Sequence, residues 1–385
     1  MMGRSGVGLR RLGTRLGRVG IRLVPAMALI RDGRIALGAL LLALPVALLA
    51  VALLRRDRLW PFLASGAPDE RLAVLTLALG LALSWWVAER GRRRLGPGGG
   101  PVAGARSRDP FIQAFMEMRT GVAALVVIGL VYLAALLTPL LAPFDPAMQG
   151  DLVTGRLLPP SRDHLLGTDQ FGRDQLSRLL YGARISLAIG LVAVGVAVTL
   201  GTLVGALAGY AGGWIDAVLM RLVDMVIAFP RLVLLIAIVA LFQPSIVLIM
   251  VILGLTQWPH IARIVRGEVM SVREREFVVA GRVLGFGPTR VLVRHVLPNS
   301  LAPLVVAASL GVGDAIVVEA ILSFLGLGVR PPTPSWGVMV AEGRAHMLGA
   351  WWLAAVPGMA IVAVVLAFNL AGDAFRDALD PRRRR

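Results

Sequence analysis

The chain has 385 residues, of which 57% are hydrophobic, and a mean hydropathy of +0.77. Its net charge is +17, all of its 40 basic residues are arginine, and it contains no cysteine. The lack of cysteine excludes disulfides and thiolate metal sites, and the lack of lysine excludes a P-loop ATPase and a Schiff-base enzyme. Several uncharged stretches are long enough to cross a bilayer, which predicts an all-α integral membrane protein.

Residues 1–109 are expected to form an amino-terminal extension. Residues 1–34 carry eight arginines, a pattern that fits either a helix lying on an anionic membrane surface or a basic tail. Apolar segments at about 35–54 and 71–89 predict a transmembrane hairpin. A Gly-, Pro- and Arg-rich linker follows, so the main domain is expected at 110–385.

This main domain contains six candidate spans, at about 119–141, 184–209, 218–242, 245–265, 301–323 and 352–372. The boundary between the third and fourth spans is not marked by charge, because residues 232–262 are uncharged for 31 positions. This stretch is too long for one ordinary span. Gln-Pro-Ser at 243–245 divides this stretch. The third span must then begin before residue 232, and Pro230 is expected to kink it.

The placement of arginine predicts the orientation. The segments 1–34, 90–119, 263–300 and 373–385 hold eight, seven, seven and five arginines, and the segments between them, 55–71, 142–183 and 325–350, hold four, four and two. Cytoplasmic loops are enriched in arginine, so both termini are expected inside, and the positive charge needs no nucleic-acid partner. If the hairpin does not cross, six spans remain with the same orientation.

Five small residues recur at every fourth position of the second main-domain span, at Ala193, Ala197, Gly201, Gly205 and Gly209. Residues four apart lie on one face of a helix. A face of small residues lets another helix backbone come close. The pattern therefore predicts a tightly packed helix pair.

Charged residues also flank or enter the third span. Arg221 and Asp224 are three residues apart and Asp224 and Arg231 are seven apart, so each pair shares one helical face. Together with Asp216 they are expected to form ion pairs along this helix that neutralise charges at the membrane edge.

The segment EFVVAGRVLGFGPTRVLVRHVLPN, residues 276–299, interrupts the apolar pattern between two predicted spans. It predicts two short helices separated by Gly-Phe-Gly-Pro and ended by Pro-Asn. Gly281, Gly285 and Gly287 allow a tight bend or a close approach, and Pro288 suits the first turn of a helix. Its arginines could simply retain the loop inside, but the loop as a unit favours docking onto a partner.

The same segment resembles the cytoplasmic signature loop of binding-protein-dependent ABC importer permeases, whose pattern is Glu-Ala-Ala, a later glycine and a Leu-Pro ending. Val279-Ala280-Gly281 stand at the Glu-Ala-Ala positions, Gly285 at the glycine and Leu297-Pro298 at the ending. Val279 therefore replaces the family glutamate.

Three further stretches resemble the C-type subunit of the dipeptide, oligopeptide and nickel branch of these importers. They are HLLGTDQFGRDQLSRLLYGARISLAIG at 164–190, EAILSFLGLGVRPPTPSWGVMVAEG at 319–343 and NLAGDAFRDALDPR at 369–382. The resemblance covers roughly 110–382 and implies a type I ABC importer transmembrane fold with six core spans. The two-helix extension within 1–109 departs from it.

The resemblance implies a non-catalytic permease subunit of an ATP-driven importer of short peptides or similar solutes, including nickel, in a bacterial or archaeal cytoplasmic membrane. Its partners would be a second homologous permease, two cytoplasmic ATPase subunits that use ATP, and an extracytoplasmic solute-binding protein. No cofactor is expected on this chain. Coupling to the ATPase is expected within 263–300, through Glu276, Val279, Ala280, Gly281, Arg282, Gly285, Gly287, Pro288, Leu297 and Pro298.

Two acids, Asp314 and Glu319, lie inside the fifth span of the main domain. Their spacing is about 140° of helical rotation, so they face different directions. A carboxylate within a bilayer usually faces a bundle interior or a watery path. Together with Ser309 and Ser323 they are candidate translocation-path residues, and hydrogen bonding between helices is the alternative.

A second functional hypothesis is a secondary transporter or channel with its own energy coupling. Such a protein would show inverted repeats with discontinuous spans at matching positions, and no such repeat is evident in the sequence. The histidines at 260, 295 and 346 have no metal-ligand spacing, so no metal site is expected.

Overall fold

The computed structural model describes residues 110–242 and 245–379. The basic segment and hairpin predicted within 1–109 lie outside these residues. The chain divides into two compact units, residues 1–141 and 142–385. Within the described ranges the helices are joined by loops, and the one β-type pairing recorded there is an isolated bridge between Thr168 and Asp174.

In the described part of the first unit, α6 (Pro110–Glu117), α7 (Arg119–Leu136) and α8 (Thr138–Leu141) follow one another. Helix α7 is long and apolar enough to cross a membrane. Its end is capped by the Thr138 hydroxyl, which donates to the carbonyl of Ala134 at 3.0 Å. The first predicted span of the main domain is therefore α7 followed by the single turn of α8.

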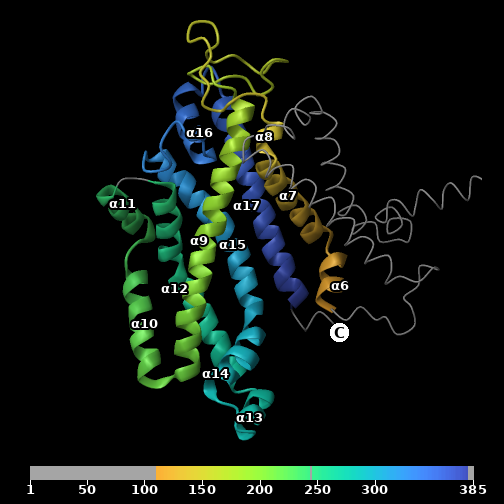
Figure 1. Ribbon diagram of the computed structural model, residues 1–385, viewed down its shortest axis with the longest axis vertical. Coiled ribbons are helices and arrows are strands. Elements are labelled where there is room, and N and C mark those ends of the chain that lie inside the picture. Colours follow the sequence, from red (N-terminus) through yellow and green to blue (C-terminus); the bar gives the residue numbers. More distant parts are fainter. Residues whose placement is uncertain (1–109, 243–244, 380–385) are drawn as a thin grey trace, which may run out of the picture. The chain divides into compact units, whose positions relative to one another are not determined.

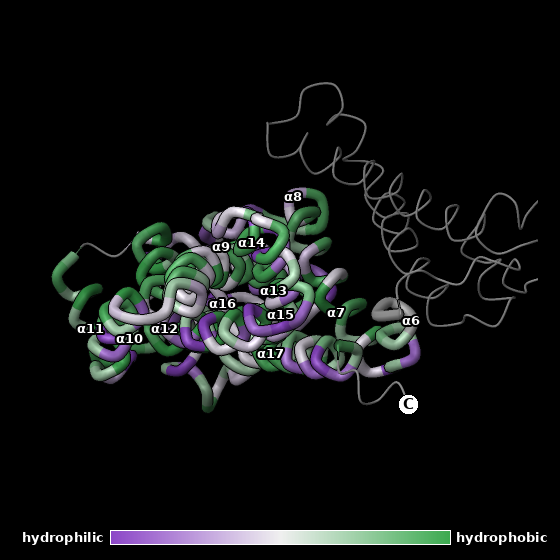
Figure 2. The backbone as a smooth tube through the Cα atoms, turned by 90° about the horizontal axis from the view of Figure 1, so that it is seen from below, coloured by the Kyte–Doolittle hydropathy of each residue, from purple (hydrophilic) through white to green (hydrophobic). Residues whose placement is uncertain are grey.

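The second unit contains the remaining helices (Figure 1): α9 (Gln175–Ala211), α10 (Gly213–Ala228), α11 (Arg231–Leu241), α12 (Ile246–Arg273), α13 (Glu276–Val283), α14 (Pro288–Val291), α15 (Leu301–Phe324), α16 (Trp336–Gly343) and α17 (Trp352–Leu379). Among the residues 110–242 and 245–379, five helices could span a membrane and one bent pair could form a sixth span. The six core spans expected from the sequence are thus confirmed. Seen from below, hydrophobic residues predominate along α11 (Figure 2).

The bent pair is α10 with α11, whose axes differ by 81°. Helix α10 ends at Ala228, and Pro230 precedes the first residue of α11 with φ −56°. Proline cannot donate to the preceding turn and its ring clashes with the carbonyl four residues earlier. The predicted kink at Pro230 is therefore confirmed, although it is a break between two helices rather than a bend within one.

Close packing between α9 and α12 forms the centre of the second unit. A side-chain carbon added to Gly201 would lie 2.6 Å from Ile261, and one added to Gly254 would lie 2.6 Å from Cβ of Val196. Each helix therefore presents a glycine to a branched side chain of the other. This confirms the helix pair predicted from the small residues at every fourth position.

Two apolar clusters lie along this helix pair. One surrounds the amino-terminal half of α12 and joins it to α9, α11 and α15 through Ile189, Leu235, Leu253 and Leu322. The other surrounds the half nearest α13 and includes Val223, Ile261, Val269 and Val278. The loop after α12 is therefore part of the packed core of the unit.

Candidate functional site

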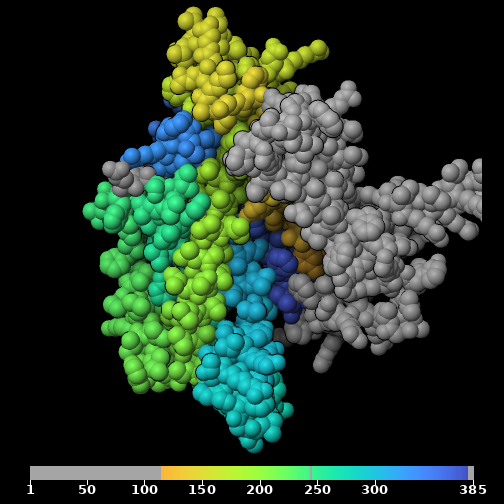
Figure 3. Space-filling model, viewed as in Figure 1, coloured from red at the N-terminus to blue at the C-terminus, as the bar shows by residue number. Residues whose placement is uncertain are grey.

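Helix α13 is attached to the rest of the unit by its buried face. Val278 on this helix and Val291 on α14 are 0% and 1% exposed, and both belong to the cluster that contains Val269 and Val272 of α12 and Val223 of α10. Burying a valine contributes about 1.5 kcal/mol or more. The segment is thus braced against α10 and α12, although it projects beyond the turn between α9 and α10 (Figures 1 and 3).

The bend after α13 is a Schellman motif, which ends a helix with a left-handed residue. The N–H of Gly285 donates to the carbonyl of Arg282 at 3.0 Å, and the N–H of Phe286 donates to the carbonyl of Gly281 at 3.1 Å. Gly285 has φ +80°, a backbone conformation that residues other than glycine rarely adopt. The glycine expected to allow a tight bend is therefore Gly285.

The other two glycines of the segment differ from each other. A Cβ on Gly281 would lie 3.3 Å from the Phe286 ring, so Gly281 serves a close approach within the loop itself. Gly287 has φ −63°, and a Cβ there would meet nothing within 4 Å. Gly287 therefore provides neither a bend nor a close approach. Pro288 opens α14, as predicted.

The helix end expected at Pro298-Asn299 is wrong. Residues 292–296 form a π turn, residues 297–300 form a 3₁₀ turn, and α15 follows directly. The N–H of Leu297 bonds to the carbonyl of Leu292, five residues earlier. Proline lacks an N–H and its ring crowds the carbonyl four residues earlier, and the widened turn accommodates this. The second short helix is thus the beginning of one helical run from 288 to 324.

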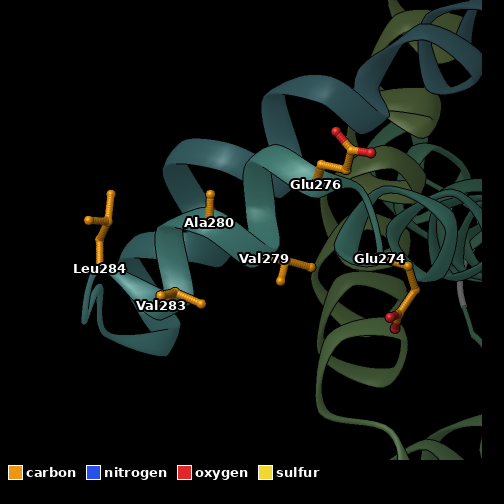
Figure 4. A pocket seen from close by; sticks show the side chains of 6 residues that line it. All are labelled: Glu274, Glu276, Val279, Ala280, Val283 and Leu284. Carbon is orange, nitrogen blue, oxygen red and sulfur yellow. The ribbon is translucent and has the colours of Figure 1, made fainter.

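The free face of α13 is apolar and lines an open hollow of about 540 Å³. Val279, Val283 and Leu284 are 43%, 82% and 73% exposed, and Ala280 lies between them (Figure 4). Glu274 and Glu276 line the end of the hollow nearest α12. Val279, which replaces the family glutamate, is therefore on this face, and Glu276 lies one turn before it.

Arginines surround this apolar face. The Arg282 guanidinium lies 5.5 Å from the centre of the Tyr210 ring, and that of Arg290 lies 4.2 Å from the centre of the Phe286 ring. Such cation–π contacts hold the guanidinium groups while leaving them accessible to solvent. Arg273 donates to the carbonyl of Gly209 at 2.7 Å and so caps the end of α9.

Charged residues of the third span do form ion pairs, but their partners lie on other helices and not along the same helix as predicted. Asp216 accepts two hydrogen bonds from Arg266 of α12, at 2.5 and 2.6 Å, and Asp224 accepts one from Arg263 of α12 at 2.6 Å. Arg231 pairs with Asp314 of α15 at 2.5 Å. Because α10 lies against α12, partners far apart in the sequence are closer than those along the same helix.

The two acids of α15 lie in different surroundings, as their spacing predicts. Asp314 is 47% exposed in its side chain. Glu319 is fully buried and accepts hydrogen bonds from the hydroxyls of Ser323 at 2.7 Å and Ser335 at 2.9 Å. Ser309 donates to the carbonyl of Phe368 on α17 at 3.0 Å. In this conformation Glu319 joins α15 to the N-cap residue of α16, Ser309 joins α15 to α17, and Ser323 bonds within α15. Asp314 is the candidate whose carboxylate is accessible.

A buried ionic cluster at the opposite end of the unit was not identified from the sequence. Asp169 accepts from Arg173 Nε at 2.6 Å and also from Arg178, and Glu342 of α16 lies 2.7 Å from Arg178. The near balance of five aspartates and four arginines in 142–183 was the available signal. The cluster ties this loop to α9 and α16.

The same loop has a short turn held by Asp151. The Thr154 hydroxyl donates to its carboxylate at 2.6 Å and the Val153 N–H donates at 2.9 Å. These two hydrogen bonds lower the pKa of Asp151, so it stays ionised at neutral pH.

Comparison with known proteins decides the family. Residues 201–385 match the family described as binding-protein-dependent transport system inner membrane component, and residues 111–160 match the N-terminal TM domain of oligopeptide transport permease C. The dipeptide transport system permease protein DppC of Alkalihalophilus pseudofirmus is 42% identical over 276 residues, which cover 71% of this chain and 90% of that protein. The chain belongs to this family of ABC importer permeases.

Two further proteins are similar to parts of this chain. The di/tripeptide transport system permease protein DppC of Pseudomonas aeruginosa is 42% identical over 71% of this permease and 91% of its own length. A solved structure of the MetNI methionine ABC transporter in inward-facing form covers 53% of this chain and 97% of its own, with 19% identity and a TM-score of 0.45.

The permease is thus a C-type subunit of the dipeptide and oligopeptide branch, and its all-helical fold is that of type I ABC importers. As a member of this family it is a non-catalytic membrane component, and ATP is hydrolysed by partner subunits. The matches give no support to a secondary transporter or a channel.

Proposed function

We propose that this permease carries short peptides across a bacterial or archaeal cytoplasmic membrane. The substrate class rests on the identity with permeases named for dipeptide and di/tripeptide transport. In this proposal a second homologous permease completes the path, an extracytoplasmic solute-binding protein delivers the peptide, and two cytoplasmic ABC ATPases supply the energy.

The face of α13 that lines the hollow is the proposed docking surface for one ATPase. The observation that carries this is the contrast between its two faces. Val278 is fully buried in the core, whereas Val283 and Leu284 on the other side are 82% and 73% exposed. Contiguous exposed apolar residues mark interaction sites in soluble regions. A cytoplasmic partner that covered this face would remove them from water.

The bracing of α13 makes it suitable as a lever. A lever has to transmit displacement without deforming, and packed cores deform little. Val278 and Val291 share a core with α12 and α10, and the run from 288 leads without interruption into α15. A push on α13 would therefore tilt α12 and α15 together, which is how ATP-driven closure of the partner would reach the path.

The orientation follows from the same proposal. The segment 263–300, with seven arginines, would face the cytoplasm together with both termini, and the loop 142–174 would face outward. In the second unit, α13 and the loop 142–174 lie at opposite ends (Figure 1). The basic loop at one end and the charge-balanced loop at the other support this direction.

Substitution Val283→Asp tests the docking surface. Burial of a valine is worth about 1.5 kcal/mol, so its loss should weaken ATPase binding by about tenfold or more. Pull-down of the ATPase with the purified permease pair would measure this, and peptide uptake by proteoliposomes should fall in parallel.

Val293→Asp is the matched control, since Val293 is also exposed, at 57%, but does not line the hollow. ATPase binding should be close to wild type in this variant. Wild-type binding and uptake in Val283→Asp would show that α13 does not dock the ATPase through this face.

A further inference from the structure

The exposed face of α15 is apolar except at one position. Asp314 lies on this face, and its other large members are Leu310, Val317, Ile321 and Phe324. A charged side chain in the middle of a span is costly when it faces lipid, and normally faces a bundle interior or a watery cavity. The face that carries Asp314 is therefore directed into the assembled transporter.

The partner of Asp314 comes from the break between α10 and α11. Arg231 is the first residue of α11, and its Nη1 donates to Asp314 Oδ2 at 2.5 Å. Its Nε lies 3.5 Å from the Thr256 hydroxyl, and its Nη2 is enclosed with no hydrogen-bond partner. The Arg231 side chain as a whole is 25% exposed and that of Asp314 is 47% exposed, so both members of the pair keep an accessible surface.

The depth of this pair separates it from the other two cross-helix pairs. Asp216 is in the first turn of α10 and Asp224 is nearer the middle of that helix, and both pair with the α13-side half of α12. Asp314 is near the middle of α15, and the other acid of that helix, Glu319, has no exposed surface. A solute near the middle of the spans would therefore meet the Arg231–Asp314 pair.

We propose that the Arg231–Asp314 pair binds the two charged ends of a zwitterionic peptide in transit. This inference rests on the proposed function as a peptide importer. The α-ammonium group would take the exposed side of Asp314, and the α-carboxylate would take the exposed part of the Arg231 side chain. An extended dipeptide spans about 7 Å, which allows it to bridge two adjacent side chains.

The electrostatics favour such an exchange site. When empty, the two residues neutralise each other, so no isolated charge is left within the membrane. When a zwitterion binds, each resident charge gains a second partner of opposite sign and the total charge of the site stays zero. Hydrogen bonds to charged groups are worth about 1.5–3 kcal/mol each, which is weak enough to let the peptide move on.

A cysteine reporter tests the site, because this chain contains no cysteine of its own. Val317 lies one turn from Asp314 on the same face of α15, and the change Val317→Cys places a thiol there. The complete importer, with partner subunits that lack reactive cysteines, would be treated with a small water-soluble thiol reagent. A dipeptide delivered by the binding protein should slow the labelling in the wild-type background.

Uncharged variants show whether the protection of the thiol depends on the charges of Asp314 and Arg231. Asp314→Asn or Arg231→Gln should raise the peptide concentration for half-protection by about tenfold or more. The control Asp224→Asn removes an equally exposed carboxylate outside the proposed site and should leave protection unchanged. If a single variant does not assemble, the double variant Asp314→Asn with Arg231→Gln, which leaves no unpaired charge, gives the answer.

Equal protection curves in the wild type and the neutral variants would overturn the inference, as would a thiol at 317 that never reacts from water. Failure of the proposed function has a different signature, namely absence of dipeptide uptake by the wild-type importer. Normal dipeptide uptake by the wild-type importer, together with equal protection in the neutral variants, would reject this site and leave the proposed function standing.

Discussion

The N–H of Phe286 donates to the carbonyl oxygen of Gly281 at 3.1 Å, and the Phe286 ring covers the same glycine. This contact closes the bend after α13 and returns the chain to the core. It also separates the roles of the glycines, since Gly285 supplies the left-handed backbone and Gly281 the space for the ring. The shape of the proposed docking segment is therefore determined by its own packing.

The bend should be sensitive to Gly285→Ala. A Cβ at this position meets nothing within 4 Å, so the cost comes from φ +80° alone, about 1–2 kcal/mol. Amide hydrogen exchange within α13 should speed up by about tenfold. Gly287→Ala is the control, because its φ is ordinary and its surroundings are open. Equal exchange in both variants would show that the left-handed residue does not hold the bend.

Packing of α9 on α12 should not tolerate Gly201→Val. The first carbon of the new side chain would lie 2.6 Å from Ile261 and 2.8 Å from the Trp258 carbonyl, and overpacking of this kind costs about 1–3 kcal/mol. The thermal midpoint in detergent should fall. Gly195→Val, on the same helix with nothing within 4 Å, should remain near wild type, and a similar fall in both would point to helix propensity instead.

Asp169→Asn should loosen the outer loop. It would leave the buried guanidinium groups of Arg173 and Arg178 with Glu342 as their shared acid. Breaking a buried pair costs about 3 kcal/mol or more, so trypsin cleavage after Arg173, which is 3% exposed, should speed up by about a hundredfold. Asp163→Asn, at an exposed position, should have no effect. Unchanged cleavage in Asp169→Asn would mean that the cluster does not hold the loop.

Single cysteines test the proposed orientation. Thiols at Gln149 or Leu348, both exposed, should react with an impermeant reagent added outside intact cells. A thiol at Arg290, which is exposed at the α13 end, should react after the membrane is opened. Labelling of Arg290→Cys from outside would reverse the assignment.

Much of the helical framework was predictable from the sequence. Long uncharged runs located the spans, because a bilayer tolerates few charges. Pro230 located the break between α10 and α11, because proline cannot continue a helix hydrogen-bond ladder. Small residues at every fourth position of α9 predicted its packing on α12, since that spacing lies on one helical face. The loop at 276–299 and its Gly285 bend were also recognisable.

Other features depended on which helices lie side by side. The ion pairs of Asp216, Asp224 and Arg231 join different helices. Spacing along one helix shows which residues share a face, but not which residues of another helix lie closer.

The amino-acid sequence was sufficient to predict a multi-span membrane protein with a basic, glycine-containing loop, because hydropathy, proline and glycine act locally along the chain. The ABC-permease type of this loop came from its resemblance to that family. The tertiary structure decided which carboxylate of α15 is buried and which is accessible, and which face of α13 is free. Whether a side chain is buried or accessible is determined by the residues that pack against it, and these are distant from it in the sequence.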